Sequence, residues 1–295
     1  MTQRKHILFI CTGNTCRSPM AEGLFRKLSA HHPEWQAGSA GTAAWPGQAA
    51  SPETLHVLRE HGVNLSSHES RPVTDELMKK LKSIQLKYQL QMQSHLSENF
   101  GEISWVQELC PDSAFYGDAY DQFGLFGKEC KTVMAHCVHS DEREIERMKE
   151  NGVFIAHCPE SNMNLSSGAA PVRTYLDRKL NVGIGSDVAG GATENLFTAM
   201  AHAIQASKLR WRLLDDSLKP LTAPEVFYMA TKGGGAFFGQ VGSFEPGYEA
   251  DIVVLDDTRL KHPQELTVQQ RLERMIYFSD EREIYAKYVA GTKLF

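Results

Sequence analysis

The chain has 295 residues, a formal net charge of −5 and a hydrophobic content of 42%. Because acidic residues are in mild excess and no basic stripe is present, we expect no nucleic-acid partner. No apolar run approaches the length of a membrane span, so we expect no membrane partner either. Six cysteines in a chain of this length, which starts without an export signal, predict a reducing and cytoplasmic location.

The first predicted element is an apolar strand that starts at His6 and is followed by a Gly-containing loop and an amphipathic helix. Cys11 and Arg17 bracket the loop with five residues between them, and Ser18 follows. Such a loop can wrap an anion with backbone N–H groups, and Arg17 can add a bidentate contact. The helix N-terminus adds positive potential, which favours the thiolate of Cys11. Cys11 is therefore a candidate nucleophile, with Ser18 as a hydrogen-bond donor to its sulfur.

A helix is predicted just after Thr74, because apolar side chains recur at helical spacing over residues 77–88 and Thr74 occupies the cap position. The next stretch, LQMQSH, is typical of a short buried strand that ends at His95. A strand of this kind needs neighbouring strands in a parallel sheet.

Four apolar runs between residues 90 and 187 each end in a residue of catalytic type. These runs are LQMQSH, TVMAH, VFIAH and VGIGSD, and they end at His95, His136, His157 and Asp187. Helical stretches separate them, which predicts consecutive βα units in a parallel sheet and hence an α/β fold. Because the strand ends share one edge, we expect a single site there. Its donors suit zinc or ferrous iron, and Glu98 is near enough to His95 to move a proton.

Residues from His6 to about Met78 resemble the low-molecular-weight protein phosphatases, through the loop CTGNTCRS and the later SAGT. The resemblance implies a phosphatase-type P-loop with Cys11 as nucleophile and with phosphate bound by the loop residues Thr12, Gly13, Asn14, Thr15, Cys16, Arg17 and Ser18. Thr15 is similar to the version found in protein arginine phosphatases, so phosphate monoesters and phosphoarginine are both implied as substrates. Cys16 matches the cysteine that can form a protective disulfide with the nucleophile in that family.

Residues from about 77 to 295 resemble the guanine deaminases of the amidohydrolase superfamily. The stretches MQSHLSEN, YDQFGLFGK, TVMAHCVH, IAHCPESNMNLSSG and VGIGSDVAGG look like strands five to eight of that TIM-type barrel, in order. The tail VGSFEPGYEADIVVLDD is similar to the return of the chain into a small β-sandwich. The resemblance implies a purine substrate, guanine, which reacts with water to give xanthine and ammonia.

The same resemblance implies a role for each strand-end residue. His95, His136 and Asp187 would bind the metal, which is zinc in this superfamily, with iron as the other candidate. Glu98 would carry a proton to the ring nitrogen and to the leaving ammonia, and Asp187 would also take the proton of the water. His136 would hold the water or the purine, while His157 and the following Ser161–Asn162 pair would line or brace the pocket.

Both segments depart from the families they resemble. No Asp-Pro acid loop follows the Cys11 loop, and no H-x-H metal pair precedes His95. We therefore expect three segments, a phosphatase-like 1–78, a barrel-like 79–240 and a β-sandwich remnant 241–295, joined within one helix. Three accounts stay open: an impaired deaminase, which a homodimer would complete with a second half; a phosphatase with a foreign C-terminal body; and an inactive fused gene product.

Overall fold

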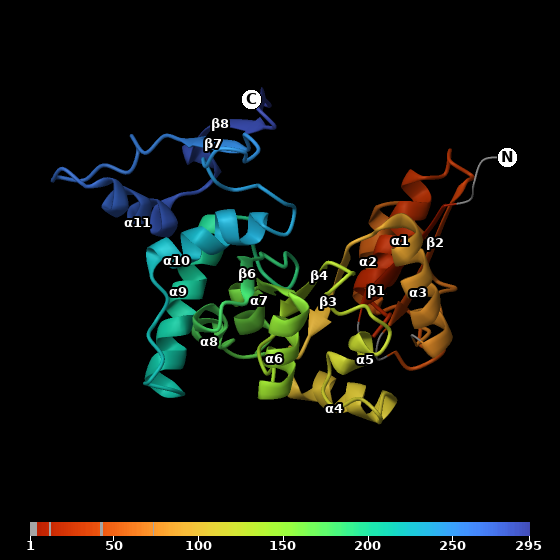
Figure 1. Cartoon of the computed structure of the whole chain (residues 1–295). Coiled ribbons are helices and arrows are strands. Elements are labelled where there is room, and N and C mark those ends of the chain that lie inside the picture. The colour runs from red at the N-terminus through yellow and green to blue at the C-terminus, as the bar shows by residue number, and fades with distance from the viewer. Residues whose placement is uncertain (1–4, 12, 42–43, 73) are drawn as a thin grey trace. The chain divides into compact units, whose positions relative to one another are not determined.

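The structure is a computed structural model that describes residues 5–11, 13–41, 44–72 and 74–295. The described chain divides into two compact units. Unit 1 comprises the described residues up to Leu90 together with Phe100–Leu125, and unit 2 comprises Gln91–Asn99 and Phe126–Phe295. In Figure 1 the colour runs from red, at β1 and β2 of unit 1, to blue, at β7 and β8 of unit 2.

Unit 1 contains a two-stranded parallel sheet in which Cys11 pairs with Gly41. Its strands are β1 (Lys5–Cys11) and β2 (Trp35–Gly41). Its helices are α1 (Arg17–Leu28), α2 (Pro52–Glu60), α3 (Asp75–Tyr88), α4 (Phe100–Leu109) and α5 (Asp118–Asp121). The helix α1 connects the two strands and contacts both, which is the crossover that a parallel pair requires. The strand, loop and helix predicted from His6 onward are confirmed.

The helix predicted after Thr74 is confirmed as α3. The Thr74 side-chain oxygen accepts a hydrogen bond from the Leu77 amide at 3.2 Å, which satisfies one of the amides left unpaired at a helix start. The helix ends where Gln89 adopts a left-handed conformation with a φ of 52°. One unbroken helix therefore spans the stretch where the two resemblances meet.

Unit 2 is built on a four-stranded parallel sheet in the order β3-β4-β5-β6, coloured from orange to green in Figure 1. Its strands are β3 (Met92–Leu96), β4 (Thr132–His136), β5 (Phe154–His157) and β6 (Asn181–Ile184). The side chains of Met134, Ile155 and Val182 are at most 2% exposed, so the strand centres form the core. The predicted parallel α/β sheet is confirmed.

Two of the four strand ends follow the prediction, and the other two differ from it. β4 and β5 end at His136 and His157 as expected, and β3 runs one residue past His95. β6 ends at Ile184, before Asp187. Asp187 has a φ of 45°, a left-handed conformation that a strand does not accommodate, so this carboxylate lies in the turn after the strand.

The rest of unit 2 consists of helices and a small antiparallel sheet. The helices are α6 (Glu142–Asn151), α7 (Pro159–Asn164), α8 (Val172–Asp177), α9 (Leu196–Leu213), α10 (Ala223–Tyr228), the π-helix η1 (Met229–Gly233), α11 (Val268–Phe278) and the 3-10 helix η2 (Glu281–Glu283). The sheet has the order β7-β8-β9, with β7 (Ile252–Leu255), β8 (Ile284–Val289) and β9 (Thr292–Lys293). Within the described ranges, no helix has both the length and the apolar character to cross a membrane.

Candidate functional site at the strand ends

The strand-end residues of unit 2 gather around one imidazole nitrogen. Nε2 of His136 lies 3.7 Å from Oε2 of Glu98 and 3.9 Å from Oδ2 of Asp187. His136 is fully buried, and Glu98 is 6% exposed. Because burial removes competing water, these groups interact more strongly than they would on the surface. Three residues that the sequence predicted to share one site therefore lie together.

The other ring nitrogen of His136 is held by Asn162. Nδ1 of His136 donates a hydrogen bond to the side-chain oxygen of Asn162 at 2.8 Å. With the proton on Nδ1, the lone pair of a neutral ring lies on Nε2. That Nε2 atom is buried and has no hydrogen-bond partner within the described structure. The ring therefore presents an acceptor to whatever occupies the space between the two carboxylates.

Serine hydroxyls hold both carboxylates. Ser167 Oγ donates to Oε1 of Glu98 at 2.9 Å, and Ser161 Oγ donates to Oδ2 of Asp187 at 2.6 Å. Hydrogen bonds to an ionised carboxylate are stronger than those between neutral groups. The two acids are thus fixed in orientation before any ligand arrives. Ser161 and Asn162, which were expected to line or brace the pocket, thus contact Asp187 and His136, and their role stays a prediction.

The turns after the strands carry backbone strain. Left-handed φ values of 45°, 72°, 49° and 45° occur at Ser97, His136, Cys137 and Asp187, all non-glycine residues. Each such residue costs on the order of 1–3 kcal/mol and persists only where its surroundings enforce it. Strained non-glycine residues concentrate at functional sites, and here they direct the strand-end side chains.

Gly190 closes the Asp187 turn by a close approach. A Cβ atom at this position would lie 2.5 Å from Ser161 Oγ and 2.7 Å from Asp187 Oδ2. The Gly190 amide donates to the backbone oxygen of Asp187 at 2.9 Å. Only glycine leaves room for the bond between Ser161 and Asp187. The glycine pair after SD was in the sequence, although its packing role was not apparent there.

Two further histidines flank His136. The ring of His95 stacks on that of His136 with centroids 5.4 Å apart. His157 is 2% exposed, and burial together with the nearby His136 lowers the pKa of His157 to about 4. His157 is therefore neutral at neutral pH. Burial, reinforced by Asp187, raises the pKa of Cys158 to about 12, so this thiol stays protonated.

A metal ion was predicted at His95, His136 and Asp187. The donors suit zinc by chemistry, and the buried Nε2 of His136 without a partner is the kind of atom that a metal satisfies. A catalytic zinc ion takes roughly three protein ligands and a water molecule. Within the described residues, however, no group of three or more His, Cys, Asp or Glu side chains is close enough together to hold a metal. The described side chains do not complete a zinc site by themselves.

Unit 1 brings together several predicted residues of the Cys11 loop. Cys11 is 5% exposed, and its sulfur lies 3.0 Å from Ser18 Oγ. The Asn14 amide donates to the same sulfur at 3.2 Å, and the Asn14 side chain donates to Ser18 Oγ and to Ser39 Oγ, both at 2.9 Å. The Asn14 amide is therefore a donor to the sulfur, whereas either the thiol or the Ser18 hydroxyl can be the donor in the contact between them.

The other predicted loop residues surround this centre less closely. Asn14 has a φ of 51°, which curls the loop, and the Thr15 carbonyl accepts from the Ser51 amide at 2.8 Å. Cys16 and Arg17 are exposed, and no disulfide joins Cys11 to Cys16. Gly13, which lies between Cys11 and Cys16 in the sequence, is half-buried. Thr12, the remaining predicted loop residue, lies outside the described residues.

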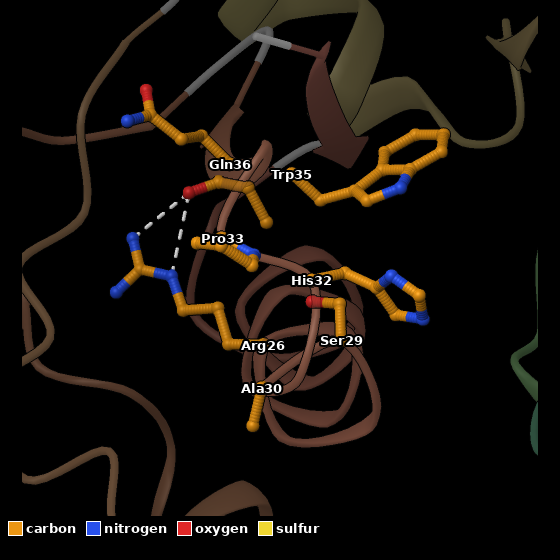
Figure 2. Close-up of a pocket in the computed structure, with 8 residues that line it drawn as sticks. Arg26, Ser29, Ala30, His32, Pro33, Trp35 and Gln36 are labelled. Atoms are coloured by element: carbon orange, nitrogen blue, oxygen red, sulfur yellow. Dashed lines mark hydrogen bonds between the residues drawn. The ribbon is translucent and has the colours of Figure 1, made fainter. Parts of the chain in front are cut away.

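Unit 1 also has a surface hollow of about 400 Å³ where α1 leads into β2. Figure 2 shows it lined by Arg26, His32 and Trp35, among others, with the Arg26 guanidinium hydrogen-bonded to the Ala37 carbonyl at 2.9 and 3.3 Å. None of the predicted site residues lines this hollow. The hollow is therefore not part of the Cys11 loop or of the strand-end site.

A parallel sheet whose strand ends place histidines and carboxylates around one buried point is typical of hydrolases with a metal-assisted, TIM-type site. The sequence pattern of the amidohydrolase family matches residues 33–294. The chain belongs to the amidohydrolase family. The match supports the deaminase part of the sequence prediction. It also includes residues 33–78, which were expected to be phosphatase-like, so the comparisons do not support a separate phosphatase segment.

Relatives with curated functions are similar to a large part of the chain. It is 38% identical to the guanine deaminase of Escherichia coli (strain K12) over 206 residues, which are 67% of this chain and 45% of that protein. It is 36% identical to the guanine deaminase of Mus musculus over 234 residues, 75% of this chain and 50% of that protein. The chain spans about half the length of these curated relatives.

Solved structures give the same family. The guanine deaminase of C. acetobutylicum with bound guanine is 37% identical with a TM-score of 0.74, and the match covers 99% of this chain and 65% of that chain. The E. coli guanine deaminase is 29% identical with a TM-score of 0.71, over 98% of this chain and 71% of that chain. A zinc-bound adenosine deaminase of Xanthomonas campestris, 20% identical with a TM-score of 0.66 over 98% of this chain and 60% of that chain, shares the fold.

Proposed function

We propose that the chain hydrolyses guanine to xanthine and ammonia at the strand ends of β3, β4, β5 and β6. The observation that carries this proposal is the approach of Glu98 and Asp187 to the buried Nε2 of His136. Support comes from the guanine deaminases to which the chain is 36–38% identical, and from the guanine-bound relative.

The reaction forms a C–O bond from water to C2 of the purine and breaks the C2–N bond to the exocyclic amine. One proton of the water must reach the ring nitrogen, and another must reach the leaving ammonia. A carboxylate can accept and return a proton in this way, and Glu98 is buried beside His136 with one oxygen fixed by Ser167. We assign to Asp187 the acceptance of the proton of the water. Nε2 of His136 carries one lone pair, so it either binds the metal or accepts a hydrogen bond from the water or the purine.

Zinc is the metal that we propose for this site, with ferrous iron as the alternative. His95, His136 and Asp187 are the proposed donors, and the chemistry of these side chains supports the assignment. When bound, such an ion lowers the pKa of a water molecule. Because the described side chains do not complete its coordination, we expect binding to be weak.

The test is release of ammonia and xanthine from guanine by the purified full chain. Glu98→Gln keeps the size of the side chain and the hydrogen bond from Ser167 but cannot shuttle a proton, so we expect kcat for guanine to fall about 10³-fold. The matched control is Glu283→Gln, because Glu283 is a carboxylate of unit 2 that is 1% exposed and binds Arg259. Equal rates for Glu98→Gln and the unmodified chain would refute the proposal.

The alternative that we propose is phosphoryl transfer at Cys11, whose sulfur accepts from the Asn14 amide and lies 3.0 Å from Ser18 Oγ. The comparisons support the deaminase and not this alternative. In it, the phosphoryl group of a phosphate monoester or of phosphoarginine passes to the sulfur, the alcohol or guanidine leaves, and water then releases phosphate. Without the acid loop the leaving group receives no proton, so we expect only slow turnover of aryl phosphates. Cys11→Ser should abolish that turnover, and Cys110→Ser, another thiol of unit 1, should not.

For the organisation of the chain, we propose the three segments 1–78, 79–240 and 241–295, a cytoplasmic location and a small-molecule purine as the partner. A homodimer is the proposed way for a second copy to complete the barrel. Light scattering of the active species separates this dimer from an active monomer.

A further inference from the structure

Glu144 is a buried carboxylate that the proposed reaction does not use. It lies in the first turn of α6 and is 1% exposed. Its Oε2 atom accepts a hydrogen bond from Ser97 Oγ at 2.7 Å. A buried carboxylate is costly unless hydrogen bonds compensate it, and an apolar residue would fill the same space at a smaller cost. Packing alone therefore does not explain why the carboxylate of Glu144 is buried here.

Ser97 holds a strained turn directly before Glu98. Its φ of 45° is left-handed, and the residue is 2% exposed. The Ser97 carbonyl accepts hydrogen bonds from the amides of Val138 and His139 at 3.1 and 2.9 Å. The turn after β3 is thereby tied to the turn after β4. Glu144 fixes the side chain of the residue whose backbone makes this connection.

A chain of hydrogen bonds continues from this turn to the far side of Glu98. The His139 amide is bound by Ser97, and Nε2 of His139 donates to the Ser167 carbonyl at 2.7 Å. Ser167 Oγ in turn donates to Oε1 of Glu98 at 2.9 Å. The backbone before Glu98 and the hydroxyl that binds its carboxylate are thus connected through Ser97.

We propose that Glu144 is a positioning residue that acts through Ser97 to hold the Glu98 carboxylate against His136. The inference rests on the proposed deaminase function, because it assigns Glu98 a proton to carry. The hydrogen bond that connects Glu144 to this turn is the one from Ser97 Oγ. Glu144 acts because a small misplacement of a catalytic group is costly, on the order of 10²-fold in rate for about 1 Å.

The test combines rate measurements with amide hydrogen exchange on the full chain. We expect Glu144→Ala and Ser97→Ala each to lower kcat for guanine about 10²-fold while KM changes less than about threefold. The double variant should lose no more than either single variant, because both remove the same interaction. Glu144→Gln still accepts from Ser97, so it should keep kcat within about threefold.

Hydrogen exchange provides a readout that does not depend on turnover. In Glu144→Ala and Ser97→Ala, the amides of Val138 and His139 should exchange at least about tenfold faster, while amides inside β4 keep their protection. Glu283→Ala, which also removes a buried carboxylate from unit 2, should lower Tm without changing either kcat or these two amides.

The outcomes separate the two proposals. An unmodified chain that never deaminates guanine refutes the proposed function, and the exchange experiment then still decides the positioning role. Unchanged exchange at Val138 and His139, or full kcat in Glu144→Ala, overturns the role of Glu144. If Glu144→Ala does not fold, Ser97→Ala and Glu144→Gln carry the same comparison.

Discussion

The two candidate sites of this chain are assembled in opposite ways. The Cys11 site of unit 1 is local, because the sulfur, the Asn14 amide and the Ser18 hydroxyl lie within eight consecutive residues, from the end of β1 to the start of α1. The strand-end site of unit 2 takes Glu98, His136 and Asp187 from loops far apart in the sequence. Distant residues brace the local site, because Asn14 is also hydrogen-bonded to Ser39 and to the Arg71 amide. The distributed site goes further, since its reacting groups themselves come together only when the sheet is in register.

The largest expected effect comes from disabling one site at a time and measuring both activities. Glu98→Gln should lower kcat for guanine by about 10³-fold, because a general acid–base group contributes roughly 10²–10⁴-fold. The same variant should leave aryl phosphate hydrolysis unchanged, and Cys11→Ser should do the reverse. Paired steady-state assays on both substrates measure this. A variant that lowers both rates would show that the two sites depend on each other.

Metal removal should also lower the activity of only one site, with a smaller effect: deamination should fall, and aryl phosphate hydrolysis should not. Because the described donors do not complete a zinc site, we expect zinc to be lost on dialysis and deamination to fall about 10²-fold, in the range for disturbed metal sites. Added zinc should restore the rate, and aryl phosphate hydrolysis should not respond. Metal analysis together with the two assays checks this. One zinc per chain retained after dialysis would contradict it.

Gly190→Ala should damage the distributed site without touching a reacting group. The new Cβ would meet Ser161 Oγ at 2.5 Å and Asp187 Oδ2 at 2.7 Å, so the bond that orients Asp187 must move. We expect kcat for guanine to fall about tenfold, within the range for a displaced catalytic group. Gly152→Ala is the control, because its Cβ meets nothing within 4 Å and only its left-handed φ of 65° is strained. That control should lower Tm alone.

Much of the fold and the membership of the strand-end site could be predicted from the sequence. Apolar runs that end in His136 and His157 identify strands, and parallel strands bring their carboxyl ends to one edge. The helix start at Thr74 could be predicted equally well, because capping is a local interaction. Local signals and a repeated βα pattern are therefore enough to predict the sheet and the edge at which the candidate site lies.

The residues that hold the site were not predictable in the same way. Ser167, Ser97 and Glu144 look like ordinary polar residues in the sequence, and only folding brings them to Glu98. The Asp187 turn was read as the end of a strand because its glycines carry no sign of the side chains they approach. Contacts between distant loops depend on register and packing, which one sequence does not display.

The smallest expected effect concerns acid stability of the scaffold around the distributed site. Arg173 of α8 binds Glu225 of α10 through two hydrogen bonds of 2.8 and 2.7 Å. Partial burial alone would raise the pKa of Glu225, but hydrogen bonds from Arg173 and Thr222 outweigh it and lower the pKa to about 2. This acid therefore adds stability above its ordinary pKa of 4.5, and that contribution is lost as the pH falls from 4.5 towards 2.

Because Glu225 is one-third exposed, we expect the pair to contribute only about 1 kcal/mol after screening by solvent. Arg173→Ala should lower the free energy of unfolding by about that amount at pH 7, and the difference should shrink as the pH falls below 4.5. Urea titrations at a series of pH values measure this, with exposed Arg212→Ala as the control. The turnover of aryl phosphate at the local Cys11 site should be the same in both variants. A loss there would mean that unit 1 needs the scaffold of unit 2, and the contrast between a local and a distributed site would fail.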